Sequence, residues 1–507
     1  MQLARSTALF ITVSIASLAF ATPARANPHD GDTSSEVLKE LRRLRDRVGE
    51  LEQWKTDRQQ ADANSDATSD QSIRQAIDAF LAKQDPATLT KGAVRAPRSL
   101  GIDFGGQFRA RGEVNNESYA GVAPNGGISD NFWLGRTRLN AKVRVRENLQ
   151  AFVEIQDARA WGTEAATAAN SANTDLSQGW VEFHNVAGKP LTVRLGRQAT
   201  SLSDQRLIGA LEWSNNGRRF DGLTATWKDE DYTATSFAYR VGEGGFAGKD
   251  SDLYGTWWEF PEALGHSTLE AFAIYMNSTV ASPSEPRGPS TLSTTAGRTR
   301  FGTYGFRLHG AEEDGSVDWD MQAATQRGRF AGDRMRAYSA RGGVGVRLSD
   351  DESKPRLGVE YNYASGDRRT NDGKRQQFET LFPTNHGHYG IHDYASLENT
   401  RSWGANVSMS PSKGVKLKLS YWRFKLDETA GGWTNAGGGT IRPGVNSGAN
   451  RSIGEELDFV VSWQVDENVQ WQFGWAHFMD GEFIRDTQTS GSAHDSDFAY
   501  IQCLVNF

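Results

Sequence analysis

From Leu100 to the end of the chain, apolar and polar residues alternate with a period of two. Leu100, Ile102 and Phe104 are apolar, for example, and polar Asp103 lies between two of them. Successive side chains of a strand point to opposite faces, so this alternation predicts strands with one apolar face. The expected segments are residues 100–113, 133–146, 149–158, 176–185, 190–199, 219–228, 231–240, 252–260, 267–276, 300–309, 316–327, 337–348, 356–364, 401–410, 414–425, 454–464, 469–478 and 497–507.

The segment Arg136–Arg146 indicates what that apolar face meets. It reads R-T-R-L-N-A-K-V-R-V-R, so one face carries Thr, Leu, Ala and Val, and the other carries five cations and an asparagine. A soluble sheet with one solvent-exposed face also alternates between apolar and polar residues. Five cations at six positions of that face would, however, be unusually many. On the lipid face of a membrane barrel, one Arg or Lys near the midplane costs roughly 2–4 kcal/mol. The pattern therefore favours a barrel whose cations line a water-filled lumen.

The connections between these segments alternate between long and short. Long ones include residues 114–132, 200–218 and 365–400, whereas Glu147–Asn148 is a two-residue turn. Outer-membrane barrels have short periplasmic turns, long external loops and, in bacteria, an even number of strands. We therefore expect an all-β transmembrane barrel of about 18 antiparallel strands over residues 100–507, in the cell outer membrane. The last strand, with its terminal aromatic residue, resembles the C-terminal signal strand of such proteins.

The residues before the barrel divide into two parts. Residues 1–26 resemble a signal peptide, because a cation precedes an apolar stretch and a small-x-small site ends at Ala26. Residues 27–99 are expected to form a periplasmic helical segment and linker. Heptad spacing over residues 36–55 predicts either a short coiled coil, which would make a homo-oligomer, or a lone amphipathic helix. The apolar positions of this heptad pattern are Val37, Leu41, Leu44, Val48 and Leu51.

The composition excludes several other classes of protein. Beyond residue 26 no run of about 18 apolar residues occurs, so we expect no helical membrane span, and a closed barrel is the remaining way to cross a bilayer. The single cysteine, Cys503, offers neither a disulfide framework nor a cysteine metal site. A net charge of −7 argues against nucleic acid held by bulk attraction. No nucleophile elbow, H-E-x-x-H, P-loop or dinucleotide motif occurs, so we expect neither an enzyme nor a cofactor.

Strand alternation places a set of cations on the lumen side. Arginine binds carboxylates through two parallel hydrogen bonds, and a row of arginines lets an anionic polymer pass from site to site without one tight trap. Arg197 falls on the lipid-facing side of its strand, but a bulge at Gly196 could turn it inward. The candidate solute-binding residues are Arg109, Arg111, Arg136, Arg138, Lys142, Arg144, Arg194, Arg197, Arg307 and Arg341.

Acidic residues on the same inner faces leave a second interpretation open. Many of the arginines could pair with neighbouring acids across strands, which would give a lumen with basic and acidic walls rather than a positive one. The inward acids are Asp103, Glu113, Glu154, Glu182, Asp318, Asp320, Glu360, Glu456 and Asp458.

Histidines and tryptophans form two further groups. His386, His388 and His392 with Asp393 have the residue types that bind Zn²⁺, but they fall in a long loop with no strand or helix to fix their geometry, so we expect no metal. Inward Trp180 and Trp422 would stack on sugar rings or simply pack. Tryptophans near strand ends predict an interfacial girdle. The girdle candidates are Trp257, Trp258, Trp463, Trp471 and Trp475.

Several short motifs, in their order along the chain, resemble the alginate-export porin family. They are Gly196–Gln198, Asp204–Gly209, Glu212–Trp213, Phe220–Gly222, Tyr363–Asp367, Phe382–Gly390, Leu417–Phe424 and Ile453–Asp458, and the likeness spans about residues 100–507. The resemblance implies an 18-stranded outer-membrane barrel. The family's best-known member exports alginate through an Arg-lined lumen with a loop over its opening. The coiled coil expected at residues 36–55 departs from that member.

These observations support one leading hypothesis and two alternatives. The leading hypothesis is an outer-membrane porin that passes an acidic polysaccharide or oligouronate through an Arg-lined lumen, without catalysis. The alternatives are a general or organic-anion diffusion porin, and an envelope tether that acts through the N-terminal helices. The expected partners are outer-membrane lipid and either an anionic polysaccharide or small anions.

Overall fold

The computed structural model describes residues 101–115, 130–162, 174–242, 250–278, 298–370, 372–384, 386–445, 448–488 and 495–507. The expected signal peptide, residues 1–26, lies outside the described residues, and so do the expected periplasmic segment and its coiled coil, residues 27–99. None of the helices that the structure describes is long and apolar enough to cross a membrane.

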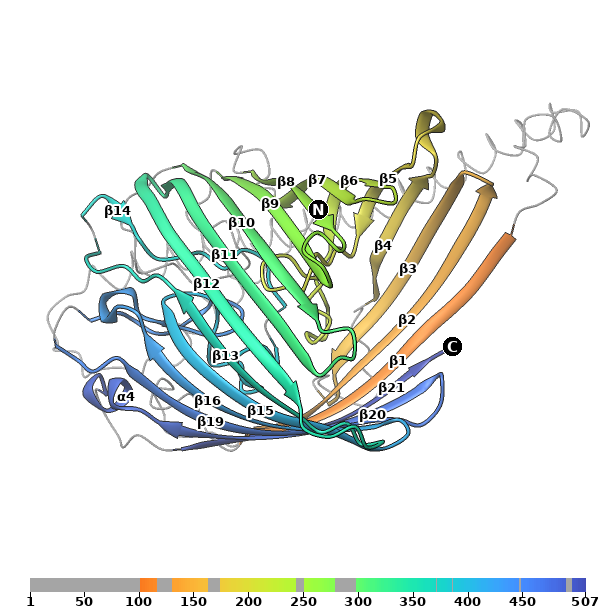
Figure 1. Cartoon of the computed structure of the whole chain (residues 1–507). Helices are drawn as coiled ribbons and strands as arrows, with labels where there is room; N and C mark the ends of the chain where they lie inside the picture. The colour runs from red at the N-terminus through yellow and green to blue at the C-terminus, as the bar shows by residue number, and fades with distance from the viewer. Residues whose placement is uncertain are drawn as a thin grey trace, which may run out of the picture. The chain divides into compact units, whose positions relative to one another are not determined.

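Eighteen strands form one closed antiparallel barrel (Figure 1), which confirms the predicted architecture. Each strand pairs with the next barrel strand along the chain, and the last pairs with the first, so no edge is left open to lipid. The strands are β1 (Gly101–Asn115), β2 (Asp130–Arg146), β3 (Leu149–Ala160), β4 (Thr174–Phe183), β5 (Leu191–Gln198), β6 (Phe220–Lys228), β7 (Thr233–Gly242), β8 (Ser251–Phe260), β9 (Ser267–Ser278), β10 (Thr299–Ala311), β11 (Val317–Phe330), β12 (Asp333–Arg347), β13 (Arg356–Ala364), β15 (Thr400–Ser412), β16 (Val415–Leu426), β19 (Ser452–Gln464), β20 (Val469–Asp480) and β21 (Ser496–Asn506).

The faces of the barrel reverse the pattern of a soluble protein. On the outer face, Phe104, Leu195 and Trp403 are 80%, 51% and 60% exposed. On the inner face of β1 and β2, Arg109 and Arg136 are only 2% and 3% exposed. Lipid covers the outer side chains, so exposed apolar residues are placed on the outside, whereas these two arginines of β1 and β2 point inward.

The two ends of the barrel differ in the length of their connections. At one end Glu147–Asn148 joins β2 to β3, and Lys413–Gly414 joins β15 to β16. At the other end residues 199–219 join β5 to β6, and residues 365–399 join β13 to β15. Short turns face the periplasm in outer-membrane barrels, so the long connections belong to the external end. One external connection is the two-residue turn Ala331–Gly332, because β11 and β12 extend further than their alternation predicted.

The last residue of the chain pairs beside the first strand. Phe507 and Gly106 exchange two backbone hydrogen bonds, of 2.7 and 3.0 Å. A Cβ at Gly106 would lie 2.5 Å from the Phe507 ring, so glycine leaves room for the terminal aromatic side chain. The free thiol of Cys503 lies on the lipid-facing alternation of β21.

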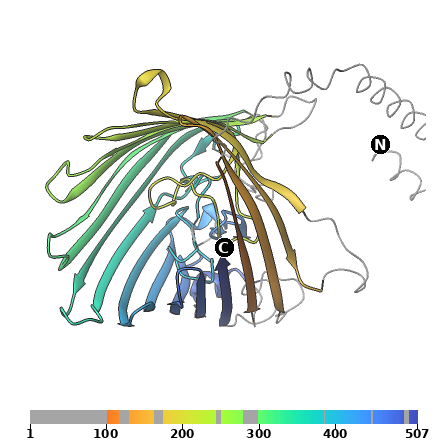
Figure 2. The same cartoon turned by 90° about the vertical axis from the view of Figure 1, so that its right-hand side faces the viewer.

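Two of the long connections run inside the barrel (Figure 2). We call residues 199–219 the inward loop and residues 365–399 the second loop. They are joined by a parallel β-bridge between Ile208 and Phe382, in which the Gly209 N–H donates to the Phe382 carbonyl at 2.8 Å. The smaller elements are η1 (Val186–Gly188), β14 (Lys374–Arg375), η3 (Thr429–Gly431), β17 (Trp433–Thr434), β18 (Thr440–Arg442) and α4 (Glu482–Asp486).

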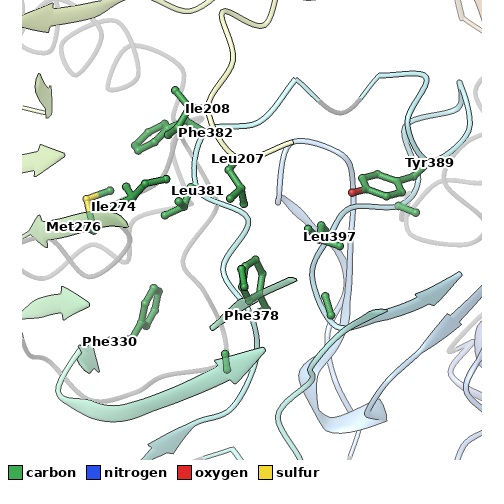
Figure 3. Packing of buried hydrophobic residues seen from close by; sticks show 14 of the residues in the cluster. Leu207, Ile208, Ile274, Met276, Phe330, Phe378, Leu381, Phe382, Tyr389 and Leu397 are labelled. Atoms are coloured by element: carbon green, nitrogen blue, oxygen red, sulfur yellow. The ribbon is translucent and has the colours of Figure 1, made fainter. Parts of the chain in front are cut away.

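The hydrophobic core lies inside the barrel, between these two loops and the inner faces of neighbouring strands (Figure 3). Leu207 and Ile208 of the inward loop are 2% and 0% exposed. Ile274 and Met276 of β9, each 1% exposed, belong to the same cluster. Strand β9 is therefore apolar on both faces, because lipid covers one face and the loops cover the other.

Candidate functional site

The inward loop is fastened to four arginines of β1 and β2, namely Arg109, Arg111, Arg136 and Arg138, which we call the basic wall. Arg109 donates to the carbonyl of Glu212 at 2.7 Å, and Arg111 donates to the carbonyl of Trp213 at 2.7 Å. The Arg111 guanidinium also lies 3.7 Å from the centre of the Trp213 ring. These arginines are all at most 5% exposed, so in this conformation they hold the loop.

The Glu212 carboxylate lies among three arginines. Its Oε2 is 2.7 Å from Arg138 and 3.2 Å from Arg136, and its Oε1 is 3.0 Å from Arg219. Burial by itself raises the pKa of this carboxyl, but the nearby guanidinium groups outweigh it, and the net pKa of Glu212 is lowered. Glu212 thus occupies the basic wall as a carboxylate supplied by the chain itself.

A second ionic network joins the base of the inward loop to the opposite wall. Asp204 pairs with Arg206 at 3.1 Å and also with Arg341. Arg307 pairs with Asp320 at 2.8 Å, and Arg341 with Asp320 at 3.0 Å. Burial raises the pKa of Asp204, but the arginines lower it further, to about 2. The predicted cations Arg307 and Arg341 are thus both paired with acids. The network also contains Glu270 and Glu360.

The remaining inner cations lie nearer the short-turn end. Arg194 pairs with Glu182 at 2.6 Å and lies 4.1 Å from the centre of the Trp180 ring. The Arg144 side chain is 62% exposed and approaches Asp103 only at 3.4 Å. Lys142 is exposed, and no ion pair links it to any of the described residues. Lys142 and Arg144, two cations of β2 with few ionic partners, therefore lie between the inward loop and the short-turn end.

These contacts favour the mixed lumen over a uniformly positive one. Arg111 pairs with Glu113 at 2.6 Å, and Arg138 lies 3.9 Å from Glu154. With the pairs described above, most of the predicted cations face an acid on the same or a neighbouring strand. Solute binding by the candidate residues stays a prediction.

Arg197 lies on the outer face, contrary to the predicted inward turn. The register of β5 with both of its neighbours is continuous through Gly196, so the alternation is kept. Arg197 shares its face with exposed Leu195 and pairs with Asp221 at 2.8 Å. The Gly196 φ of 132° therefore leaves the direction of the next side chain unchanged.

The histidines of the second loop make separate contacts. The His386 ring stacks on Trp213 at 3.5 Å and lies 3.0 Å from Asp393. His388 donates to the carbonyl of Asp204 at 2.9 Å, and His392 donates to that of Ser496 at 3.0 Å. Among the described residues, no group of three His, Cys, Asp or Glu side chains could hold a metal ion. These histidines join the second loop to the inward loop and to the wall.

The tryptophans divide between lipid and lumen. Trp258, Trp463 and Trp471 are 37–49% exposed on the outer face, as a girdle requires. Trp257 is 2% exposed, faces inward, and donates to Glu270 at 2.8 Å, so its predicted girdle position is wrong. Its strand is apolar on both faces, and alternation alone cannot then choose between them. Inward Trp180 stacks on Phe152, with 5.1 Å between the ring centres.

Sequence reasoning missed the loop residues that make the site. Glu212 and Asp204 were seen only as family motifs, and Glu456 only as one lumen acid. In the structure the Glu456 carboxylate accepts backbone N–H bonds from Ile391 and His392 at 2.8 and 2.9 Å, so it fastens the second loop. The sequence of Asp204–Gly209 carried a signal that this long connection folds inward, because charged residues precede an apolar pair, Leu207 and Ile208, that is buried in the structure.

Comparison with known proteins gives one family match and several structural likenesses. The family model described as alginate export matches residues 101–496. Pseudomonas aeruginosa OpdK with vanillate is similar at 9% identity over 80% of this chain and 99% of that chain, with a TM-score of 0.52. Pseudomonas aeruginosa OccK2 (OpdF) in complex with glucuronate is similar at 10% identity over 80% and 98%, with a TM-score of 0.51. These two likenesses show a shared fold. Among curated proteins, none matches the chain.

Proposed function

The chain belongs to the alginate export family, and on that premise we propose that this outer-membrane porin passes an acidic polysaccharide or oligouronate without catalysis. The observation that carries the proposal is the Glu212 carboxylate on the basic wall. A uronic acid presents the same group to the same arginines. Glucuronate bound by the structurally similar OccK2 is consistent with a uronate as cargo.

The proposed route begins at the short-turn end. Lys142 and Arg144 are exposed there and attract a polymer carboxylate, while Arg194 stacked on Trp180 offers a cation beside an aromatic face. The polymer carboxylate then competes with Glu212 for Arg138. When it replaces Glu212, the inward loop moves away from the basic wall. Exchange of one carboxylate for another costs little, because the arginines keep a charged partner throughout.

Planar-bilayer recording tests this proposal. We expect anion-selective current that falls when oligouronates are added, and no such fall with neutral oligosaccharides of the same length. Arg138→Glu with Arg144→Glu should reduce the anion selectivity and the block. The matched control is Arg423→Glu with Lys425→Glu, which makes the same charge change on the outer face of β16. Unchanged selectivity in the first variant would refute a role for the basic wall.

The alternatives predict different recordings. A general or organic-anion diffusion porin would conduct small uronates and aromatic acids, and oligomers would not block it. The likeness to OpdK, solved with vanillate, is the observation in favour of that alternative. An envelope tether would show no current at all.

A further inference from the structure

One row of directly opposed residues runs along the outer face at the external end of the barrel. It crosses from β5 to β14 through consecutive register pairs, so its members are neighbours around the wall. The row reads Arg197, Asp221, Arg240, Asp252, Asn277, Arg300, Arg329, Arg334 and Lys374.

The first half of this row alternates in sign. Arg197 pairs with Asp221 at 2.8 Å, and Arg240 pairs with Asp252 at 2.6 Å. Opposite charges directly across strands stabilise a sheet. This half of the row therefore needs nothing from outside the chain.

The second half carries arginines directly opposite one another. Arg300 faces Arg329, and Arg329 faces Arg334. Two residues further along the same strands, Arg327 faces Arg336. We call these five residues the arginine patch. Like charges directly opposite one another destabilise a sheet, so this arrangement calls for a compensating anion.

The described residues do not supply that anion. Arg300 donates to the Asn277 side chain at 3.1 Å, and Arg329 donates to the Gly332 carbonyl at 3.0 Å. Arg327 donates to the Tyr338 hydroxyl at 2.6 Å. No ion pair joins any member of the patch to a carboxylate of the described residues.

The position of the arginine patch along the barrel axis identifies which layer of the membrane it faces. Outward Tyr338 is two residues from Arg336, and outward Tyr275, 41% exposed, faces Gly302 beside Arg327. Aromatic side chains of this kind mark the boundary between acyl chains and headgroups. The long connections place this boundary in the outer leaflet. The patch therefore lies at headgroup level on the lipid side of the wall, where a polymer passing through the lumen cannot reach it.

We propose that the arginine patch binds the phosphate groups of a phosphorylated glycolipid in the outer leaflet. Arginine forks match phosphate oxygens, and several of them at one height can share the phosphates of one headgroup. Bound phosphate removes the repulsion between facing arginines and ties the long-loop end of β10–β12 to the membrane surface.

Glycolipid retained by the purified, detergent-solubilised protein tests the proposal. Native mass spectrometry should detect phosphorylated glycolipid on the wild type, and Arg327→Gln/Arg329→Gln/Arg334→Gln/Arg336→Gln should reduce it by at least about tenfold, since each cation near an anionic lipid surface is worth about a fivefold factor. The control Arg401→Gln/Arg423→Gln/Lys425→Gln removes outward cations of β15 and β16 and should retain glycolipid. Equal retention in both variants would overturn the proposal.

A second measurement needs only the wild type, in case the variant folds poorly. Lipid A added to delipidated protein should raise its unfolding temperature, and dephosphorylated lipid A should not. Equal stabilisation by the two lipids would show that the phosphates are not recognised. Equal stabilisation by inorganic phosphate alone would show that the patch binds phosphate without a glycolipid, and either result would overturn the proposal.

Discussion

At the scale of single residues, Glu212 occupies the basic wall that a solute carboxylate would need. We expect Glu212→Gln to weaken the hold on the inward loop by about 1–2 kcal/mol, because a charged hydrogen bond to a partly exposed group is lost. Single-channel recording should show a larger or noisier conductance. Oligouronate should also block at a lower concentration, by up to roughly tenfold, since its competitor is gone.

A matched substitution separates this effect from a general loss of charge. Glu147→Gln makes the same change in the exposed turn between β2 and β3, and it should leave conductance and block unchanged. If Glu212→Gln behaves like Glu147→Gln, the carboxylate does not compete with the solute.

Two histidines of the second loop, half-buried His388 and buried His392, are expected to give the barrel a pH dependence. Burial lowers the pKa of His388 and of His392 to about 3. An unfolded histidine binds its proton near pH 6.5, so between pH 6.5 and about 3 the unfolded state binds more protons, and stability falls as the pH falls. The unfolding temperature should therefore drop from pH 7.5 to pH 5. His388→Gln/His392→Gln should flatten this dependence, whereas exposed His266→Gln should not.

At the scale of elements, the two interior loops behave as one unit because Ile208 and Phe382 join them. Ile208 is 0% exposed, so Ile208→Asp would bury a carboxylate without a partner, at a cost of several kcal/mol. We expect the loops to separate, the conductance to rise and the barrel to stay folded. Leu264→Asp, at a residue 63% exposed in a turn, is the control. Unchanged conductance would mean that the bridge does not hold the loops.

The strands could be predicted from sequence because lipid imposes a local rule. Every second residue of a membrane strand must be apolar, and each strand obeys this rule without reference to the others. The path of the inward loop follows no such rule, because it depends on partners such as Phe382 that lie far away in sequence. The same reason explains Trp257, whose inward position is set by the loops and not by its own strand.

The candidate site, too, could be predicted only in part from the sequence. Strand alternation alone placed Arg109 and Arg136 on the inner face, and the structure agrees. What those arginines contact could not be predicted, since Glu212 reaches them from another part of the chain. Sequence reasoning therefore located one wall of the site and missed the loop that covers it.

At the scale of the whole molecule, the barrel satisfies its own backbone hydrogen bonds by closing β21 on β1. We therefore expect the chain without residues 27–85, but with its export signal, to insert and conduct as the full chain does. Heat-dependent gel migration and bilayer recording would check this. A change of oligomeric mass on deletion would support the coiled coil expected at residues 36–55, and an aggregated product would contradict an autonomous barrel.

The contacts between the interior loops also set an order of assembly. The Leu211 N–H donates to the Thr384 hydroxyl 173 residues further along the chain, so the inward loop has no final position until β13 and the second loop have arrived. Contacts of such long sequence separation form late. Up to that moment the inward loop lacks the partner that holds it across the lumen. A cell that makes this protein must therefore close the barrel and position its two interior loops at nearly the same time, or tolerate a brief leak through each newly inserted copy.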